Sequence, residues 1–428
     1  MLKKKAALLS ALTAVLGLTP GCGGQERPGD APTDQDPITL HVFQAGAGIT
    51  DTEFKELIAD PVKKKYPHLT LELLRETKET NRNDLVASGR FPDLIFTSSL
   101  GVPGFLDIGL ASDLNELIDK SKTDLNAFEK RAIDEIKAFG KDGQVYALPF
   151  SLNGGVMFYN KTIFDRAGLP YPKDGMTWEE TIELAKKLAL KVPDVRALSN
   201  EGGIRVAEDM RLPYADPDTQ KAAVNSDKWK YLFRILKDIN DIPDNKNAKG
   251  ALAGFQKDQT VAMYTNYLGR LGEFEEMKKQ GIAIDWDMVS MPVLKDDPQG
   301  MQTEAHVLMI SSMSKQRETA FQVVRFLSSD EEVQTRVAKK ARISSLKDDK
   351  FKQMFGSELT ALQGKNVQSV FKTKYGPNAY PSNYNTAIRT IGGKKLAEYY
   401  EGKDANSALR EWEEEANKAI AEAKAAGK

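Results

Sequence analysis

The 428-residue chain is 41% hydrophobic and 28% charged, which is typical of a globular protein and long enough for two domains. Its 60 basic and 61 acidic residues nearly cancel, and no basic tract is long enough to favour a nucleic-acid partner. A single cysteine excludes an intramolecular disulfide framework.

The N-terminus has the pattern of an exported protein. Lys3, Lys4 and Lys5 precede a mostly apolar run over residues 6–18, which is too short for the roughly 20 residues of a membrane-spanning helix. Small and turn-forming residues follow this run. The sequence therefore predicts a signal peptide over residues 1–21.

The only cysteine, Cys22, follows Gly21 in a pattern that resembles the lipobox of bacterial lipoproteins. In that class the leader is cut just before the cysteine and the thiol is diacylated, and two acyl chains give stable membrane anchoring. Leu18 lies one position before the usual place of the motif's leucine. Residues 22–36 are rich in Gly, Pro, Asp and Gln without apolar periodicity, so they are predicted to be a flexible tether. The alternative is an ordinary secreted protein with one unpaired cysteine.

Strand and helix patterns alternate at the start of the mature chain. A β-rich run at residues 38–44 leads to an amphipathic helix, for which Thr50 and Glu53 form a capping box. Further strands are predicted at residues 69–74 and 93–98, with a second helix between them. This order predicts a parallel sheet with right-handed crossovers.

The same alternation continues to the C-terminus. A second capping box, Thr177 with Glu180, begins one helix, and a long helix begins near Ala405. Their apolar stripes are Trp178, Ile182, Ala185 and Leu188 in the first helix and Leu409, Trp412, Ala416 and Ile420 in the second. Extended segments are predicted at residues 144–150, 154–161, 196–199, 260–265, 287–292 and 306–312. The chain is therefore predicted to be α/β, in two lobes.

Catalytic motifs are missing from the sequence. Gly46 and Gly48 follow the first strand, but no third glycine completes a dinucleotide fingerprint, so a turn that directs helix N–H groups at a ligand is the better interpretation. The histidines are His41, His68 and His306, of which the first two are interpreted as structural. No HExxH or CxxC motif occurs. We expect no metal, no cofactor and no enzymatic activity.

Five blocks carry a resemblance to a known family. They are residues 88–99, 142–172, 177–188, 257–267 and 309–334, and YALPF…FYNKTIFDRAGL…TW is the most specific pattern. In this order they resemble the extracellular solute-binding proteins of the maltose-binding-protein type, which are receptors of ABC importers. The resemblance implies the type II periplasmic-binding-protein fold, with two interleaved lobes, a hinge and a sugar bound between them. Such receptors are commonly lipid-anchored in bacteria with one membrane, so we expect a location on the extracellular face of the cell membrane.

The resemblance also implies where the chain crosses between lobes. The crossings fall near residues 150–153, 290–293 and 343–346. Lobe 1 would then comprise residues 37–150 and 293–344, and lobe 2 would comprise residues 151–292 and 345–428.

Three regions of the second lobe are implied to contact the sugar. Glu201 lies in the loop that reaches the ligand in the family, and Tyr380 and Tyr384 lie in a late segment that carries a stacking aromatic residue. Tyr264 and Tyr267 are the candidates to replace a tryptophan that often follows VAM in the family. Aromatic faces stack on the C–H faces of a pyranose.

Polar candidates come from predicted strand ends, where open α/β sheets bind ligands. Side chains of these types satisfy sugar hydroxyls with hydrogen bonds. The candidates at these strand ends are Gln44, Ser98, Ser99 and Asn153. Two further candidates, Glu304 and His306, lie where a later strand begins, and Arg342 lies near a predicted cleft loop.

The sequence thus predicts a monomeric carbohydrate-binding receptor that captures an oligosaccharide between two closing lobes and delivers it to ABC transporter permease subunits. A surface enzyme acting on polysaccharide and a sugar-sensing receptor for a histidine kinase are the alternatives. The charge of the sugar stays open. Four arginines near predicted cleft loops would suit a uronate or other acidic sugar, namely Arg205, Arg211, Arg270 and Arg342.

Overall fold

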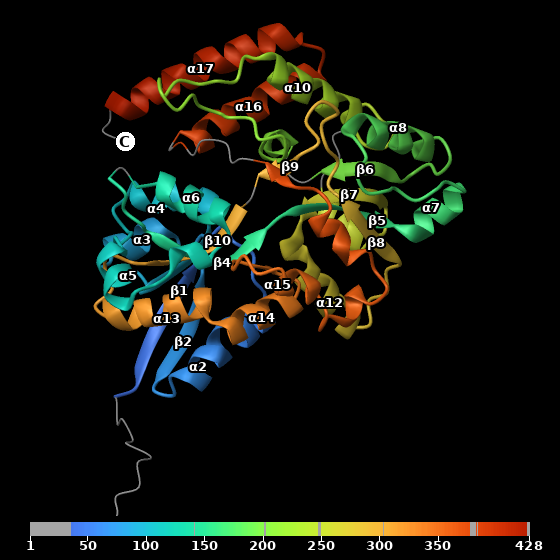
Figure 1. Cartoon of the computed structure of the whole chain (residues 1–428). Helices are drawn as coiled ribbons and strands as arrows, with labels where there is room; N and C mark the ends of the chain where they lie inside the picture. Colours follow the sequence, from blue (N-terminus) through green and yellow to red (C-terminus); the bar gives the residue numbers. More distant parts are fainter. Residues whose placement is uncertain are drawn as a thin grey trace, which may run out of the picture. The chain divides into compact units, whose positions relative to one another are not determined.

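A computed structural model describes residues 36–140, 142–200, 203–246, 250–302, 304–376, 382 and 384–425. Residues 37–428 form one compact unit, which contains two main sheets and the helices around them (Figure 1). The predicted signal peptide, Cys22 and almost all of the predicted tether lie outside the described residues.

The first sheet has six strands in the order β11-β4-β10-β3-β1-β2. They are β1 (Ile38–Gln44), β2 (Leu69–Arg75), β3 (Leu94–Ser98), β4 (Ala147–Asn153), β10 (Glu304–Ile310) and β11 (Ile343–Ser344). Strand β1 pairs in parallel with β2 and β3, so the predicted parallel start is confirmed. Strand β10 instead runs antiparallel to both β3 and β4, so the whole sheet is mixed. Every residue of β4 and β10 is buried, as in strands covered on both faces.

The helices that accompany this sheet come from two distant parts of the chain (Figure 1). They are α1 (Asp51–Phe54), α2 (Asp60–Lys65), α3 (Arg82–Ala87), α4 (Val102–Leu106), α5 (Asn115–Ser121), α6 (Lys130–Ala138), α13 (Arg317–Ser329), α14 (Glu331–Lys339) and α15 (Lys350–Gln353).

The helix predicted after Thr50 begins as expected and is then interrupted. Both capping-box hydrogen bonds are present, from Thr50 N to Glu53 Oε2 at 2.9 Å and from Glu53 N to Thr50 Oγ1 at 3.1 Å. A π-helical turn, η1 (Lys55–Ala59), separates α1 from α2. Pro61 lies in the first turn of α2 and has no N–H, so it cannot donate the backbone hydrogen bond of a regular helix. The wider π-helical turn before Pro61 accommodates this missing hydrogen bond.

The second sheet has four strands in the order β6-β7-β5-β8. They are β5 (Gly155–Asn160), β6 (Arg196–Asn200), β7 (Val261–Tyr267) and β8 (Trp286–Ser290). Strand β5 is antiparallel to β7 and β8, and β6 is parallel to β7. Because β4 runs into β5 across Gly154 alone, one extended segment joins the two sheets.

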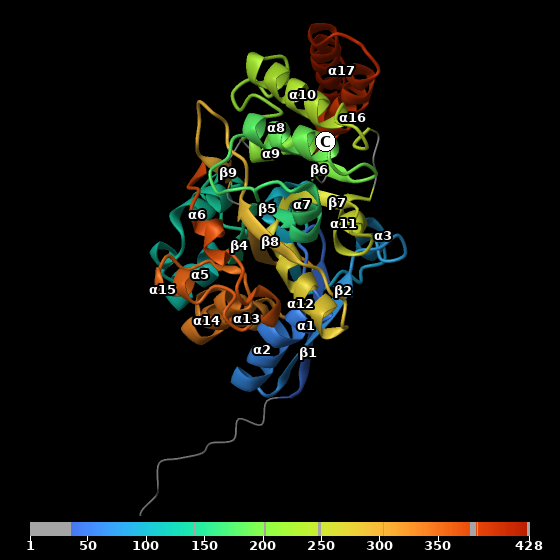
Figure 2. The same cartoon turned by 90° about the vertical axis from the view of Figure 1, so that its right-hand side faces the viewer.

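The helices around the second sheet lie on both of its sides, with α10, α16 and α17 on one side and α12, next to α1, on the other (Figure 2). They are α7 (Lys161–Ala167), α8 (Trp178–Ala189), α9 (Val206–Asp209), α10 (Asp227–Asn240), α11 (Ala251–Gln256), α12 (Leu271–Lys279), α16 (Asn385–Tyr400) and α17 (Ala405–Ala425). The predicted capping box at Thr177 and Glu180 is present at the start of α8. A short parallel pair, β9 (Gly300–Gln302) with β12 (Tyr375–Gly376), was not predicted.

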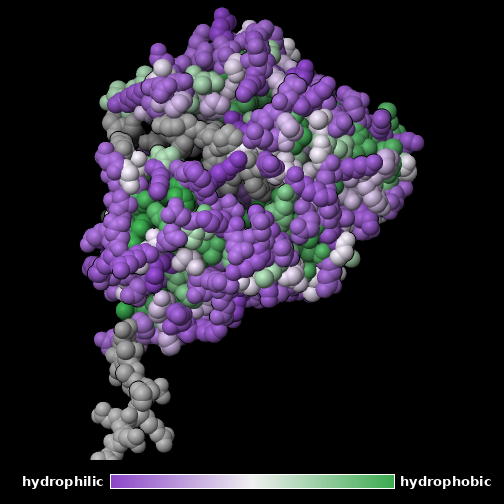
Figure 3. Space-filling view, viewed as in Figure 1, coloured by the Kyte–Doolittle hydropathy of each residue, from purple (hydrophilic) through white to green (hydrophobic). Residues whose placement is uncertain are grey.

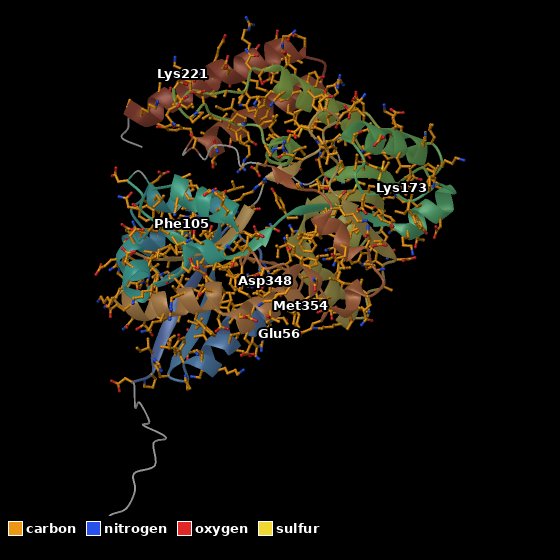
Figure 4. The ribbon with its side chains drawn as sticks, viewed as in Figure 1. Glu56, Phe105, Lys173, Lys221, Asp348 and Met354 are labelled. Carbon is orange, nitrogen blue, oxygen red and sulfur yellow. The ribbon has the colours of Figure 1, made fainter. Side chains whose placement is uncertain are left out.

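The buried residues fall into two hydrophobic clusters. One cluster covers the first sheet and continues to the face of the second sheet that carries Phe158 and Trp286, against which Phe274 of α12 packs. The other lies between the opposite face of the second sheet and helices such as α8, α10 and α17. Figure 4 shows Phe105 among the elements of the first sheet, and Lys173 and Lys221 among those around the second.

The surface view shows mostly hydrophilic residues with scattered hydrophobic areas (Figure 3). In the described part of the chain, no helix has both the length and the apolar character to span a membrane.

The C-terminal helix packs as its sequence pattern predicts. Leu409, Trp412, Ala416 and Ile420 are all buried. The indole Nε1 of Trp412 donates a 2.7 Å hydrogen bond to the carbonyl oxygen of Ile388 in α16. The close approach of α16 to the Trp412 ring depends on a glycine, because a Cβ atom at Gly392 would lie 2.4 Å from that ring.

This contact predicts opposite effects for two adjacent substitutions. Gly392→Ala places its methyl group into the Trp412 ring, so we expect the free energy of unfolding to fall by about 1–3 kcal/mol. The matched control Gly393→Ala meets no atom within 4 Å and adds a better helix former, so it should raise that free energy by about 0.5–1 kcal/mol. Urea unfolding of both variants measures the difference, and equal effects would contradict the packing described.

Candidate ligand-binding cleft

A cavity of about 280 Å³ lies where strand ends of both sheets meet. From the first sheet and its helices it is lined by Gln44, Gly46, Gly48, Ile49, Thr50, Glu53, Arg75, Asn153, Glu304 and His306. From the second sheet and α12 it is lined by Asn266, Tyr267, Gly269, Arg270 and Glu273. We call this cavity the cleft.

One wall of the cleft is the turn between β1 and α1. Gly46 has a φ of 77°, which glycine adopts without steric cost and which turns the chain toward the helix. Arg75, the last residue of β2, fixes this turn: its Nη1 donates to Gln44 Oε1 at 3.0 Å and to the Ile49 carbonyl oxygen at 2.9 Å. Its Nη2 also pairs with Asp51 Oδ1 at 2.6 Å. One guanidinium group therefore fixes this wall, and its hydrogen bonds are made to groups of the protein itself.

The floor of the cleft contains a buried charged network. Arg342 donates from Nε and Nη2 to the two carboxylate oxygens of Glu53, both at 2.9 Å. Its Nη2 also donates to the carbonyl oxygen of Gly48 at 2.8 Å. On the other side Gly272 of α12 covers Glu53, since a Cβ atom there would lie 3.0 Å from the carboxyl carbon. The network thus joins the turn after β1, α1 and α12.

His306 belongs to this network as a neutral side chain. Its Nδ1 lies 3.1 Å from Nη1 of Arg342, and because a guanidinium has only donors, that nitrogen must accept the hydrogen bond. Burial and then the Arg342 charge lower the pKa of the His306 imidazole from 6.5 to about 3. At neutral pH the ring therefore carries its single proton on Nε2.

The opposite wall joins the end of β4 in the first sheet to the residues that follow β7 of the second sheet. Asn153, at the end of β4, donates from Nδ2 to Glu304 Oε2 at 3.2 Å and accepts from the Gly269 N–H at 3.3 Å. Arg270 pairs with Glu273 Oε1 at 2.6 Å. These contacts place amide, carboxylate and guanidinium groups on one surface.

Tyr267 lies on the same wall, and residues outside the cleft position its hydroxyl group. Its hydroxyl lies 3.3 Å from Glu208 Oε2, to which it donates. Arg389 of α16 binds the other carboxylate oxygen of Glu208 at 3.1 Å. The phenol ring is thus positioned by α9 and α16, although neither helix contributes a lining residue.

Five of the candidates predicted from the sequence line the cleft: Gln44, Asn153, Tyr267, Glu304 and His306. Arg342 does not line it and instead binds the lining residues Glu53 and His306. Glu201 and Tyr380 lie outside the described residues.

The two serines at the end of β3 do not reach the cleft. Ser98 is buried opposite His306 in the antiparallel ladder with β10. Ser99 accepts a hydrogen bond at Oγ from the Ala305 N–H at 3.1 Å. Both serines therefore contact β10 and not the cleft. Strand β10 lies beside β3, at the position where the sequence analysis expected an open strand end.

Two of the predicted tyrosines also lie elsewhere. Tyr264 is 1% exposed and packs against Phe158 and Phe255, with ring centroids 6.4 and 5.7 Å away. Tyr384 is half-buried, with the Lys424 ammonium 5.7 Å from its ring centre, and does not line the cleft. Of these tyrosines, only Tyr267 lines the cleft among the described residues.

The sequence analysis assigned no ligand-facing role to five further charged or polar lining residues. These are Thr50, Glu53, Arg75, Asn266 and Glu273. Arg75 and Asn266 stand at the ends of β2 and β7, so the strand-end rule would have found them. Thr50 and Glu53 were interpreted only as a helix cap, and Glu273 lies inside α12, where sequence alone does not reveal a cleft.

A model of the family described as bacterial extracellular solute-binding protein matches residues 47–334. The chain belongs to this family. Its resemblance to such receptors, predicted from sequence blocks, is thereby confirmed.

Two curated relatives align with parts of the chain. The arabinooligosaccharide-binding protein of Bacillus subtilis (strain 168) is 24% identical over 299 residues, which is 65% of this chain and 65% of that protein. The lactose-binding protein of Rhizobium radiobacter is 27% identical over 149 residues, 33% of this chain and 34% of that protein. The aligned part of the chain thus spans less than two thirds of each relative.

Solved structures of solute-binding proteins share the fold. An ABC substrate-binding protein from Listeria monocytogenes in complex with cycloalternan has a TM-score of 0.74 and 19% identity, covering 90% of this chain and 100% of that one. A binding protein from B. animalis subsp. lactis Bl-04 in complex with β-1,6-galactobiose has a TM-score of 0.70 and 19% identity, covering 90% and 98%. The predicted α/β, two-lobed fold is therefore confirmed.

The neutral state of His306 predicts a pH dependence of stability. Its folded pKa of about 3 lies below the unfolded value near 6.5, so its contribution is complete above pH 6.5 and is lost as pH falls toward 3. His306→Asn keeps an acceptor for Arg342 and removes the titration. We expect its unfolding free energy to depend less on pH between 4 and 6, by up to about 1.4 kcal/mol per pH unit.

Urea unfolding at several pH values measures this slope. His68→Asn, which removes a histidine outside the cleft, is the matched control. A slope in His306→Asn equal to that of the wild type would contradict a buried neutral His306.

Proposed function

We propose that the chain is a carbohydrate-binding receptor of an ABC importer, which captures an oligosaccharide in the cleft between its two lobes. The observation that carries this proposal is the lining of the cleft. Strand ends of both sheets bring amide, carboxylate and guanidinium groups and one phenol together there. Five of the lining residues are among the ligand-binding candidates that the sequence predicts.

The chemistry of these groups suits a polyhydroxylated ligand. Each sugar hydroxyl both donates and accepts, and Asn153, Asn266 and Glu304 provide acceptors and donors that are themselves buried. An unpaired polar group costs about 1–3 kcal/mol when it is desolvated, so a ligand must match the pattern to bind. Tyr267 adds an aromatic ring at the edge of the same surface.

The relatives support the same ligand class. One is named for arabinooligosaccharide binding and the other for lactose binding. The two solved structures described above hold cycloalternan and β-1,6-galactobiose. We therefore assign an oligosaccharide, rather than a peptide or a metal ion, to the cleft.

We further propose lobe 1 as residues 37–150 with 293–344 and lobe 2 as residues 151–292 with 345–428. The strand memberships support this division, because β4 and β11 pair in the first sheet whereas β5 and β8 pair in the second. Ligand contacts from both lobes would stabilise the closed form by a population shift, and the closed receptor would then deliver the sugar to the permease as a monomer.

A thermal-shift screen tests the ligand class. The wild type is heated with arabinotriose, lactose, maltotriose and β-1,6-galactobiose, with a tripeptide and Zn²⁺ as controls. A binder at 100 times its dissociation constant should stabilise the protein by about 2.7 kcal/mol. Stabilisation by the peptide or the metal alone would contradict the proposal, and turnover of any glycan would favour an enzyme.

Asn153 tests the site itself. Asn153→Ala removes groups that bind Glu304 and Gly269, so we expect calorimetric affinity for the identified sugar to fall about 10–100-fold. Asn225→Ala, which removes an exposed amide bonded to Glu413, is the matched control and should keep wild-type affinity. Equal affinity in both variants would place the sugar elsewhere.

We also propose that Cys22 carries the lipid anchor that holds the receptor on the extracellular face of a bacterium with one membrane. The lipobox-like pattern before Cys22 supports this proposal. In such a host, labelled palmitate should be incorporated into the wild type and not into Cys22→Ala, which should be released into the medium. Thr33→Ala, in the predicted tether, is the control, and labelling of Cys22→Ala would contradict the assignment.

A further inference from the structure

We infer that Glu275 is a positioning residue for sugar binding, because it fastens a short segment, residues 356–362, across the two lobes and thereby holds α12 at the cleft. We call this segment the strap. The inference rests on the proposed function and adds a residue outside the cleft that determines how tightly the ligand binds. Figure 4 labels Met354, which lies just before the strap in the chain.

One end of the strap is bound to α14 beside the first sheet. The Gly356 N–H donates to the carbonyl oxygen of Ala338 at 2.9 Å, and the Glu358 N–H donates to that of Lys339 at 3.1 Å. The Glu358 carboxylate also pairs with Lys339 and Lys340, at 3.5 and 3.7 Å. Two backbone hydrogen bonds therefore attach this end of the strap to the first lobe.

The other end of the strap is bound to α12 of the second lobe. The Ala361 N–H donates to Glu275 Oε2 at 2.8 Å, and the Thr360 hydroxyl lies 3.3 and 3.4 Å from the two carboxylate oxygens. Lys278, almost one turn later in α12, donates from Nζ to the carbonyl oxygen of Thr360 at 2.7 Å. Glu275 is only 6% exposed, so removal of its carboxylate would leave the buried Ala361 N–H without this acceptor.

A single residue, Leu359, separates the two bound ends of the strap. Leu359 and Leu362 are buried in the hydrophobic cluster that covers the first sheet and reaches α12. A change in the angle between the lobes has to be absorbed by the backbone torsions of this short stretch, or it has to break the hydrogen bonds to Glu275. The strap therefore limits how far α12 can move relative to α14.

Helix α12 transmits this restraint to the cleft. Glu273 lines the cleft from the first turn of the helix, and Arg270, which also lines it, comes directly before the helix. Gly272 in the same turn faces Glu53 of the first lobe, since a Cβ atom at Gly272 would lie 3.0 Å from the carboxyl carbon. Glu275 follows Gly272 by three residues, so its hydrogen bonds fix the same turn from the side of the strap.

The affinity for a ligand depends on this restraint. Groups that are already held in their binding positions lose little conformational entropy when the ligand arrives. Without the hydrogen bonds to Glu275, α12 can adopt more positions in the free receptor, and only a fraction of them bring the lining residues of both lobes to the ligand together. The observed affinity falls in proportion to that fraction.

Calorimetry and small-angle X-ray scattering test this role, with arabinotriose, lactose, maltotriose and β-1,6-galactobiose as the probes. In Glu275→Ala the affinity for the sugar that binds the wild type should fall about 5–10-fold. The ligand-free variant should also have a larger radius of gyration than the ligand-free wild type. Glu275→Gln keeps an oxygen for the Ala361 N–H and should recover most of both quantities. A purely structural role would lower the free energy of unfolding and leave both at their wild-type values.

Two further variants separate this effect from general damage. Glu276→Ala is the matched control, because it removes the adjacent carboxylate of α12, which takes no part in the hydrogen bonds to the strap described above and is not a lining residue of the cleft. Thr360→Val keeps the shape of the side chain and removes only its hydroxyl, so it should lower the affinity about two- to threefold even if Glu275→Ala does not fold.

The outcomes distinguish this inference from the proposed function. Wild-type affinity and radius in Glu275→Ala, wild-type affinity in Thr360→Val, or an equal loss in Glu276→Ala would overturn the role of Glu275 and leave the proposed function intact. Failure of the wild type to bind any of the four sugars would overturn the proposed function and, with it, the inference.

Discussion

The buried pair of Arg342 and Glu53 is the interaction on which the arrangement of the cleft depends. Two charges this far from water are tolerated only when their hydrogen bonds are satisfied, and here the guanidinium binds both carboxylate oxygens, Gly48 and His306. The helix cap at Thr50, the turn after β1, and β10 are thereby fixed to one group. Removal of one partner would leave the other charge buried, at a cost of about 3–5 kcal/mol.

The short connections between the two sheets explain how such a rigid floor can serve a two-lobed receptor. Strand β4 continues into β5 across Gly154, and Asn153, the last residue of β4, bonds both Glu304 on one side and Gly269 on the other. A ligand that contacts Asn153 therefore touches the point where the chain passes between the sheets. A ligand bound at this point would favour one arrangement of the lobes, because it would contact both sides together.

The sequence analysis succeeded where local patterns determine structure. Alternating strand patterns, both capping boxes and the apolar stripe of α17 depend on neighbours along the chain, and all are present. It failed where a distant segment decides the outcome. Ser98 and Ser99 were expected at an open strand end, yet β10 arrives from 200 residues later and covers them. Tyr264 and Tyr267 looked equivalent in one strand, and only the packing of Phe158 and Phe255 makes the first a core residue.

Distant segments of the chain also determine the charge of the cleft, which local sequence patterns do not reveal. A list of arginines near a site suggests an acidic ligand, but a guanidinium recruits a ligand carboxylate only if the fold has not supplied one. Arg270 and Glu273 are neighbours on one helix turn and could be paired by inspection, whereas Arg342 and Glu53 are 289 positions apart. The long-range pair also neutralises the floor and keeps His306 uncharged, so these three residues do not make the cleft a cationic pocket. The charge of a binding site is thus a property of the tertiary structure, even when every residue in it can be named from the sequence.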